Sequence, residues 1–173
     1  MGVTGSIAAY KSADIIRRLI EKGLKVSVVM TKNAEHFITP LTLSALAGEE
    51  VCRDMFDPVE SSWKMPHIEL ARQASLILIA PATANVIGKI ANGIADDLLT
   101  CLILAAKGPV LLAPAMNDEM YKNTIVQENC EKLKKHGYKF IAPTKGKLAC
   151  GVVGEGHIAD EEEIVRVVLK NLD

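Results

Sequence analysis

Short aliphatic runs without polar interruptions alternate with longer stretches of helical periodicity along this chain. The runs share β-branched and leucine-rich composition and cover residues 2–4, 26–30, 51–53, 76–80, 110–113 and 139–141. Uninterrupted apolar runs are typical of strands that are buried on both faces. The pattern therefore predicts a parallel sheet.

The stretches between the runs have the spacing of amphipathic helices. Residues 7–22 gather their aliphatic side chains near one face, and Gly23 follows as the expected stop. Residues 123–136 repeat this scheme. A last helix is expected at residues 161–172, where Asp160 is the expected N-cap and acidic residues fill the first turn.

Regular alternation of strands and helices favours an α/β three-layer sandwich with a mainly parallel sheet and right-handed crossovers. A length of 173 residues suits a single domain that spans residues 1–173. Hydrophobic residues make up 49% of the chain but aromatic residues only 4%, so the core is expected to be aliphatic.

Charge and cysteine usage exclude several classes of protein. The net charge is -1 and the pI is about 6.4, which gives no basic field for nucleic acid or for an anionic membrane. No apolar segment has the length of a membrane helix, and the N-terminus lacks the apolar core of a signal peptide. The cysteines are scattered without a CxxC pair, and no His, Cys, Asp and Glu cluster has metal-ligand spacing. We expect a cytoplasmic protein with reduced thiols and no bound metal.

Two turns that follow expected strands have the composition of anion-binding sites. Gly5 and Ser6 lie between the first strand and a helix, where backbone amides and a hydroxyl attract phosphate. An ordinary turn with Ser6 as the N-cap explains these residues equally well. Residues 81–85 form a second such turn, and residues 31–33 follow the neighbouring strand. The first turn is not a GxGxxG motif, which argues against a nicotinamide dinucleotide.

Other residues at the expected ligand-binding edge carry reactive or polar groups. Asn117 follows a strand, and a short amide there suits a carboxylate or carbonyl. Cys150 lies in a glycine-rich stretch, residues 148–157, which we interpret as a mobile flap. Asp96 and Asp97 point apart if they are helical, so we interpret them as helix-terminal or interface charges rather than as an acid–base pair. His67 carries no functional signal of its own.

Four ordered motifs at residues 2–11, 81–85, 114–121 and 149–151 resemble those of the homo-oligomeric flavin-containing cysteine decarboxylases. The resemblance covers essentially the whole chain. Within that family, the phosphopantothenoylcysteine decarboxylases are the most similar group, and their domain is often fused to a synthetase. The resemblance implies a Rossmann-like flavoprotein sandwich that assembles as homotrimers, or multiples of them, with FMN at subunit contacts.

The same resemblance implies a cofactor site and a substrate site. The residues that would hold FMN are Gly5, Ser6, Ile7, Thr31, Thr83, Ala84 and Asn85. The residues that would contact the substrate are Asn117, Met120, Ala149 and Gly151. Val86 and Tyr121 depart from the family motifs, which have a threonine and a tryptophan at these positions.

The implied reaction is FMN-dependent decarboxylation of 4′-phosphopantothenoylcysteine to 4′-phosphopantetheine in coenzyme A biosynthesis. By resemblance, His67 is the catalytic base, Asn117 orients the substrate carboxylate and Cys150 donates the final proton. A fused or separate phosphopantothenoylcysteine synthetase is the implied partner. Alternatives are a peptidyl-cysteine decarboxylase, a flavin prenyltransferase or a non-catalytic FMN-binding regulatory subunit.

Overall fold

Five parallel strands form the central sheet in the order β2-β1-β3-β4-β5, which confirms the predicted α/β class. This computed structural model describes residues 1–56, 65–147, 151 and 153–172. The strands are β1 (Gly2–Val3), β2 (Val29–Met30), β3 (Ile77–Ala82), β4 (Val110–Pro114) and β5 (Lys139–Phe140).

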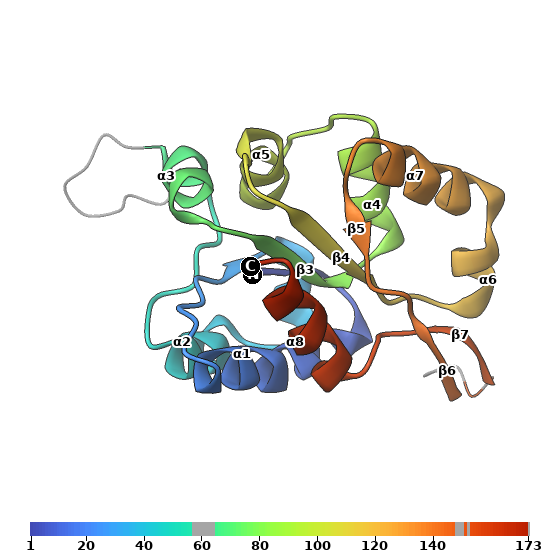
Figure 1. Ribbon diagram of the computed structural model, residues 1–173, viewed down its shortest axis with the longest axis horizontal. Helices are drawn as coiled ribbons and strands as arrows, with labels where there is room; N and C mark the ends of the chain where they lie inside the picture. Colours follow the sequence, from blue (N-terminus) through green and yellow to red (C-terminus); the bar gives the residue numbers. More distant parts are fainter. Residues whose placement is uncertain (57–64, 148–150, 152, 173) are drawn as a thin grey trace.

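Helices cover both faces of this sheet (Figure 1). On one face lie α1 (Lys11–Glu21), α2 (Pro40–Ala47) and α8 (Glu161–Lys170). On the other lie α3 (Pro66–Gln73), α4 (Ala84–Ala91), α5 (Leu98–Ala105) and α7 (Thr124–Lys135). Short elements follow three of the strands: η1 (Ile7–Tyr10) leads into α1, η2 (Lys32–His36) follows β2, and α6 (Asp118–Lys122) follows β4.

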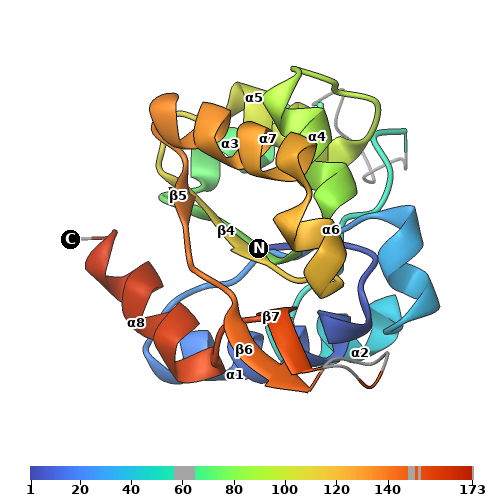
Figure 2. The same cartoon turned by 90° about the vertical axis from the view of Figure 1, so that its right-hand side faces the viewer.

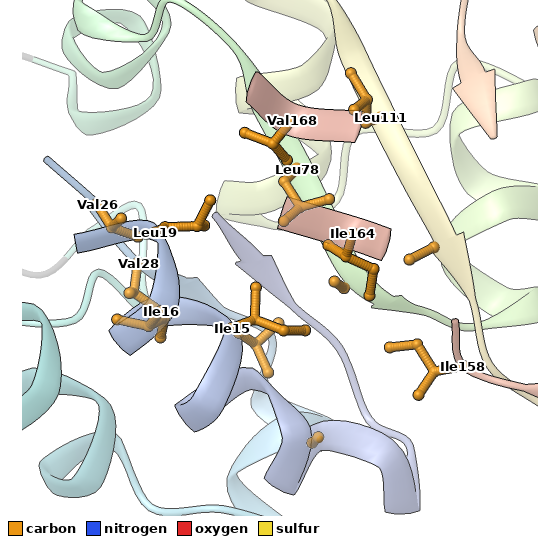
Figure 3. Packing of buried hydrophobic residues seen from close by; sticks show 14 of the residues in the cluster. Ile15, Ile16, Leu19, Val26, Val28, Leu78, Leu111, Ile158, Ile164 and Val168 are labelled. Carbon is orange, nitrogen blue, oxygen red and sulfur yellow. The ribbon is translucent and has the colours of Figure 1, made fainter. Parts of the chain in front are cut away.

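Alternate residues of the central strands belong to two buried aliphatic clusters, one under each helical layer. Leu78 of β3 and Leu111 of β4 pack toward α1 and α8 (Figure 3). Their neighbours Ile79 and Leu112, both 0% exposed, belong to the cluster under the opposite layer. Burial on both faces explains why these strands read as continuous apolar runs rather than as alternating ones.

Several predicted elements are shorter than their sequence patterns. The apolar run at residues 26–30 forms a strand only at Val29–Met30, because β1 pairs with these two positions alone. Residues 51–53 contribute an isolated bridge from Cys52 to Val29 rather than a strand. Helix α5 begins at Leu98, because the Asp97 side chain caps it. Asp160 occupies the predicted N-cap of α8 but makes no side-chain capping bond.

The glycine-rich stretch expected to be a loop contains a strand in its described part. Strands β6 (Thr144–Lys147) and β7 (Val153–His157) pair antiparallel and form a separate two-stranded sheet. Figure 2 shows this hairpin next to α6 and the start of α8. Residues 148–150 and 152 of the expected flap lie outside the described residues.

The strand order determines where a ligand is expected. The chain moves outward from β1 to β2 and then crosses back to β3 on the other side of β1. In open sheets with the order 2-1-3-4-5, ligands bind at the carboxyl ends of the strands beside this reversal. The segments after β1 and β3 are the ones on which the sequence places its candidate turns.

Candidate functional site

A cavity of about 420 Å³ lies at the carboxyl ends of the strands, next to the β1–β3 reversal. Its lining comes from the segments after β1, β2, β3 and β4, together with the first turns of α4 and the loop before α5. The lining residues are Thr4, Gly5, Ser6, Thr31, Lys32, Asn33, Thr83, Ala84, Asn85, Val86, Lys89, Asp97, Ala115, Met116 and Met120.

The turn after β1 is shaped by Gly5 and Ser6. A Cβ atom at Gly5 would lie 2.6 Å from the Cβ of Asn33, so the close approach of the two turns requires glycine here. The Ser6 hydroxyl accepts a hydrogen bond of 3.3 Å from the Ala8 N–H and so caps η1. Capping and cavity lining therefore coexist at Ser6, and the two interpretations of this residue do not exclude one another.

The turn after β3 has the same organisation. Thr83 is the N-cap of α4, and its hydroxyl accepts a hydrogen bond of 3.3 Å from the Val86 N–H. The first amides of a helix have no intrahelical acceptor, which applies here to Ala84 and Asn85. Buried Thr4, which the sequence analysis did not select, joins the turns by accepting a 3.2 Å bond from the Thr83 N–H.

A cluster of charged side chains lies beside these turns. The Lys89 ammonium contacts the two carboxylate oxygens of Asp96 at 2.7 and 2.9 Å, and one carboxylate oxygen of Asp97 at 3.5 Å. The hydrogen bond to Asp96 raises the pKa of Lys89, and the same bond lowers the pKa of Asp96. Asp97 also forms a capping box with Thr100. This agrees with interpreting the paired aspartates as helix-terminal charges.

Asn117 borders the cavity without being among its lining residues. It is the N-cap of α6, and its side-chain oxygen accepts hydrogen bonds from the N–H groups of Glu119 at 2.9 Å and Met120 at 3.3 Å. Met116 and Met120, on either side of it in the sequence, both line the cavity. The structure thus brings Asn117 to the edge of the site.

His67 is not brought to this cavity by its own chain, as far as the described residues extend. It is the second residue of α3, and the Nδ1 atom of its ring is buried without a hydrogen-bond partner among the described residues. Ile7 is 60% exposed and, like the exposed Gly151, is not among the lining residues. Ala149 and Cys150 lie outside the described residues.

The cavity therefore collects most, but not all, of the residues proposed from the sequence. Those that line it are Gly5, Ser6, Thr31, Thr83, Ala84, Asn85 and Met120. The lining residues to which the sequence analysis gave no role in the site are Thr4, Lys32, Asn33, Val86, Lys89, Asp97, Ala115 and Met116. Lys89 lies one helical turn beyond Asn85, the last residue of the second turn. The i,i+4 spacing from Asn85 was the signal that could have indicated Lys89.

A second cavity of about 330 Å³ opens at the amino ends of the strands. Its lining includes Met1, Val26 and Leu78, and none of the proposed site residues. Ligand sites of open α/β sheets lie at the opposite edge, so the first cavity is the candidate site.

Hydroxyl-bearing turns at the ends of adjacent parallel strands, next to the reversal of strand order, define an α/β protein that binds a phosphate-bearing ligand. The family model described as Flavoprotein matches residues 1–173, and the chain belongs to this family. Among the residues that the structure describes, no helix is long and apolar enough to cross a bilayer. In the same residues no group of three or more His, Cys, Asp or Glu side chains could hold a metal ion.

Curated relatives are longer than this chain. The coenzyme A biosynthesis bifunctional protein CoaBC of Vibrio cholerae is 49% identical over 165 residues, which are 95% of this chain and 41% of that protein. CoaBC of Bacillus subtilis is 48% identical over 169 residues, 98% of this chain and 41% of that protein. The chain thus spans about two fifths of the length of these relatives.

Solved structures share the whole fold. A PPC decarboxylase variant complexed with pantothenoylaminoethenethiol has a TM-score of 0.86 and is 35% identical, covering 98% of this chain and 94% of that chain. The FMN binding protein AtHal3 has a TM-score of 0.82 and is 36% identical, covering 98% of this chain and 92% of that chain.

Proposed function

We propose that this chain is an FMN-dependent decarboxylase that converts 4′-phosphopantothenoylcysteine to 4′-phosphopantetheine in coenzyme A biosynthesis. The observation that carries the proposal is the cavity itself: two capped turns for a phosphate group at one side and the Asn117 turn at its edge. The similarity to bifunctional coenzyme A biosynthesis proteins supports the same substrate class.

The residues of the cavity fit FMN. Hydroxyls of Ser6, Thr31 and Thr83, and amides at the starts of η1 and α4, form a donor set that suits a phosphate. The volume of about 420 Å³ lies within the range of cofactor pockets. We assign Gly5, Ser6, Ile7, Thr31, Thr83, Ala84 and Asn85 to the flavin, Ile7 through its exposed position at the start of η1.

The chain's own groups position the substrate and move its protons. Bound FMN would supply the oxidation of the cysteine thiol to a thioaldehyde, which can accept the electrons released with carbon dioxide, and the later return of hydride. Asn117 orients the carboxylate by hydrogen bonding, without a full positive charge that would stabilise the ground state. His67 takes the proton of the thiol, and Cys150 returns a proton to the ene-thiolate that decarboxylation leaves. Met120, Ala149 and Gly151 complete the substrate contacts.

A homotrimer, or a multiple of one, would place His67 where the reaction needs it. Since His67 is absent from the lining of its own cavity, we propose that His67 of the partner subunit reaches the site at a subunit contact. Exposed apolar side chains at Ile7, Tyr10 and Met120, close to the cavity in sequence or lining it, support a covered surface here.

The proposed setting of the enzyme follows from its relatives. Their bifunctional names support a phosphopantothenoylcysteine synthetase as a fused or separate partner. The similarity to coenzyme A biosynthesis proteins supports a cytoplasmic location.

Product analysis tests the proposed function. Purified protein reconstituted with FMN should release carbon dioxide from 4′-phosphopantothenoylcysteine and give a product with the mass of 4′-phosphopantetheine. Asn117→Ala should retain FMN but lose most of this activity. Turnover of a peptide with a C-terminal cysteine instead would assign the chain to the peptidyl-cysteine decarboxylases, and FMN binding without either turnover would make it a binding subunit.

A further inference from the structure

The carboxylate of Asp118 is buried although it lies in the first turn of a short surface helix. The residue is 7% exposed. Its Oδ1 accepts a hydrogen bond of 2.9 Å from the backbone N–H of Glu155 in β7, and its Oδ2 lies 2.7 Å from the Lys122 ammonium. Burying a carboxylate is costly unless it is paired and hydrogen-bonded, and here the bonds to Lys122 and to the β7 backbone offset that cost and fix the carboxylate against β7.

What Asp118 contacts is the backbone of the β6–β7 hairpin. A Cβ atom at Gly154 would lie 2.5 Å from the Cγ of Asp118, so the strand can approach the carboxylate only with glycine at this position. At Gly156 a Cβ would lie 2.3 Å from the Met116 carbonyl oxygen. The Met116 N–H donates a hydrogen bond of 3.0 Å to the Gly156 carbonyl.

These contacts bracket Asn117. Met116, the residue before Asn117, is hydrogen-bonded to Gly156 of β7, and Asp118, the residue after it, is hydrogen-bonded to Glu155 of β7. The segment that carries the candidate substrate amide is therefore attached to the hairpin on both sides. The two ties join elements that are separated by more than thirty residues in the sequence.

We propose that Asp118 is a positioning residue that locks the β6–β7 hairpin to the Asn117 turn, so that the turn and β7 keep a fixed relative position. Gly154 and Gly156, which have no Cβ atom, let β7 approach Asp118 and Met116. Lys122 keeps the carboxylate of Asp118 charged. The effect on substrate handling rests on the proposed function, whereas the lock itself does not.

Hydrogen exchange of the Glu155 amide measures the lock without any reference to activity. Asp118→Ala should raise the exchange rate of this amide at least tenfold, because its acceptor is gone. Asp118→Asn keeps an acceptor oxygen and should retain most of the protection. Glu119→Gln removes a neighbouring exposed charge from the same helix and should change nothing.

A double-mutant cycle separates the lock from a general loss of stability. Gly154→Ala should raise Glu155 exchange in the wild type, because the new Cβ would push β7 away from Asp118. It should add little to Glu155 exchange in the Asp118→Ala background, because the Glu155 N–H has already lost its carboxylate acceptor there. Additive effects, or unchanged Glu155 exchange in a folded Asp118→Ala variant, would overturn the proposal.

Kinetics then test the link to the substrate. With FMN content unchanged, Asp118→Ala should lower kcat/KM for 4′-phosphopantothenoylcysteine roughly tenfold, because a small displacement of a positioning group is expensive in rate. Asp118→Asn should recover most of that loss. Full activity in Asp118→Ala with a released Glu155 amide would reject the positioning role and leave a purely structural lock. If the wild type does not turn over this substrate, the proposed function fails while the exchange data still decide the lock.

Discussion

The hydroxyl of Thr4 donates a hydrogen bond of 2.7 Å to the backbone carbonyl of Pro81. The two residues are 77 positions apart in the sequence, and Thr4 is 2% exposed. Since the same hydroxyl oxygen accepts from the Thr83 N–H, one side chain fixes the turn after β1 to the turn after β3. The buried Thr4 hydroxyl therefore helps to set the spacing between the two proposed phosphate-binding turns.

Replacing Thr4 should damage both stability and cofactor binding. Thr4→Val preserves the shape but removes the donor to the buried Pro81 carbonyl and the acceptor of the part-buried Thr83 N–H, and should cost about 1–3 kcal/mol of unfolding free energy. FMN affinity should fall in parallel. Urea unfolding and flavin titration measure the two effects. Thr4→Ser, which retains the hydroxyl, serves as the control, and equal losses in both variants would argue against the bridge.

A negative charge at Ser6 should expel the cofactor. The purified protein is expected to be yellow, with FMN that is released on denaturation. Ser6→Asp places a carboxylate beside the proposed phosphate position, where like charges about 4 Å apart repel by roughly 4 kcal/mol before screening. Ser6→Ala removes the hydroxyl without adding charge and should retain much more flavin. The flavin-to-protein absorbance ratio is the measurement, and a yellow Ser6→Asp variant would contradict the assignment.

The proposed roles of His67 and Cys150 differ in the step at which each variant stops. His67→Asn should keep FMN but leave its absorbance unbleached on addition of substrate, with no release of carbon dioxide. Cys150→Ser should decarboxylate and then stall at an ene-thiol with two hydrogens fewer than 4′-phosphopantetheine, because a hydroxyl is a much weaker acid than a thiol. Mass spectrometry of single turnovers distinguishes the two. Ene-thiol accumulation in His67→Asn would mean that the roles are reversed.

Mixed oligomers test whether the site is shared between subunits. His67→Asn should be inactive alone, and Asn117→Ala should retain little activity alone. Co-refolded at equal amounts, they should regain activity at about a quarter of the sites, because a closed ring then contains sites with both wild-type residues. Light scattering should give a homotrimer or a multiple of one. A fully active monomer, or mixtures without recovered activity, would contradict the shared site.

Acidification should weaken the wild type more than a variant without the Asp118 charge. The hydrogen bond from Lys122 holds the pKa of Asp118 below its ordinary value, helped by the Glu155 N–H and opposed by desolvation. The carboxylate's contribution to stability is thus fully present above about pH 4 and is lost as the pH falls through the lowered pKa. The stability advantage over Asp118→Asn, measured by urea unfolding, should be constant between neutral pH and about pH 5 and shrink below about pH 4. An advantage independent of pH would show that the charge is not involved.

Sequence patterns identified the sheet because its strands are buried on both faces. They overestimated the length of β2. The number of paired residues in a strand depends on its partner, and β1 offers only two residues for pairing. Helix α2 was missed although Thr39 and Pro40 form a recognisable start: the Thr39 hydroxyl caps the helix and Pro40 is its first residue. Its low amphipathic character left no periodic signal to support that start.

The features near the site that sequence patterns did not reveal depend on contacts between residues that are distant in the chain. Strands β6 and β7 lack apolar alternation, and β7 is held by Asp118 and Met116, which are distant in the chain. The turns around Gly5 and Thr83 were recognisable because their capping chemistry is local. The position of His67 outside the lining of its own cavity could not be read from motifs, because it depends on the packing of α3 against distant segments such as α5.

The strand order also determines the stage of folding at which the cavity forms. Its walls come from the beginning, the middle and the later part of the chain, from Thr4 to Met120, and β1 meets β3 through the pairing of Gly2 with Ile79. Such a pairing closes a long loop and is slow to form. The two proposed phosphate-binding turns can meet once β3 has been synthesised, whereas the complete cavity needs the segment after β4 as far as Met120.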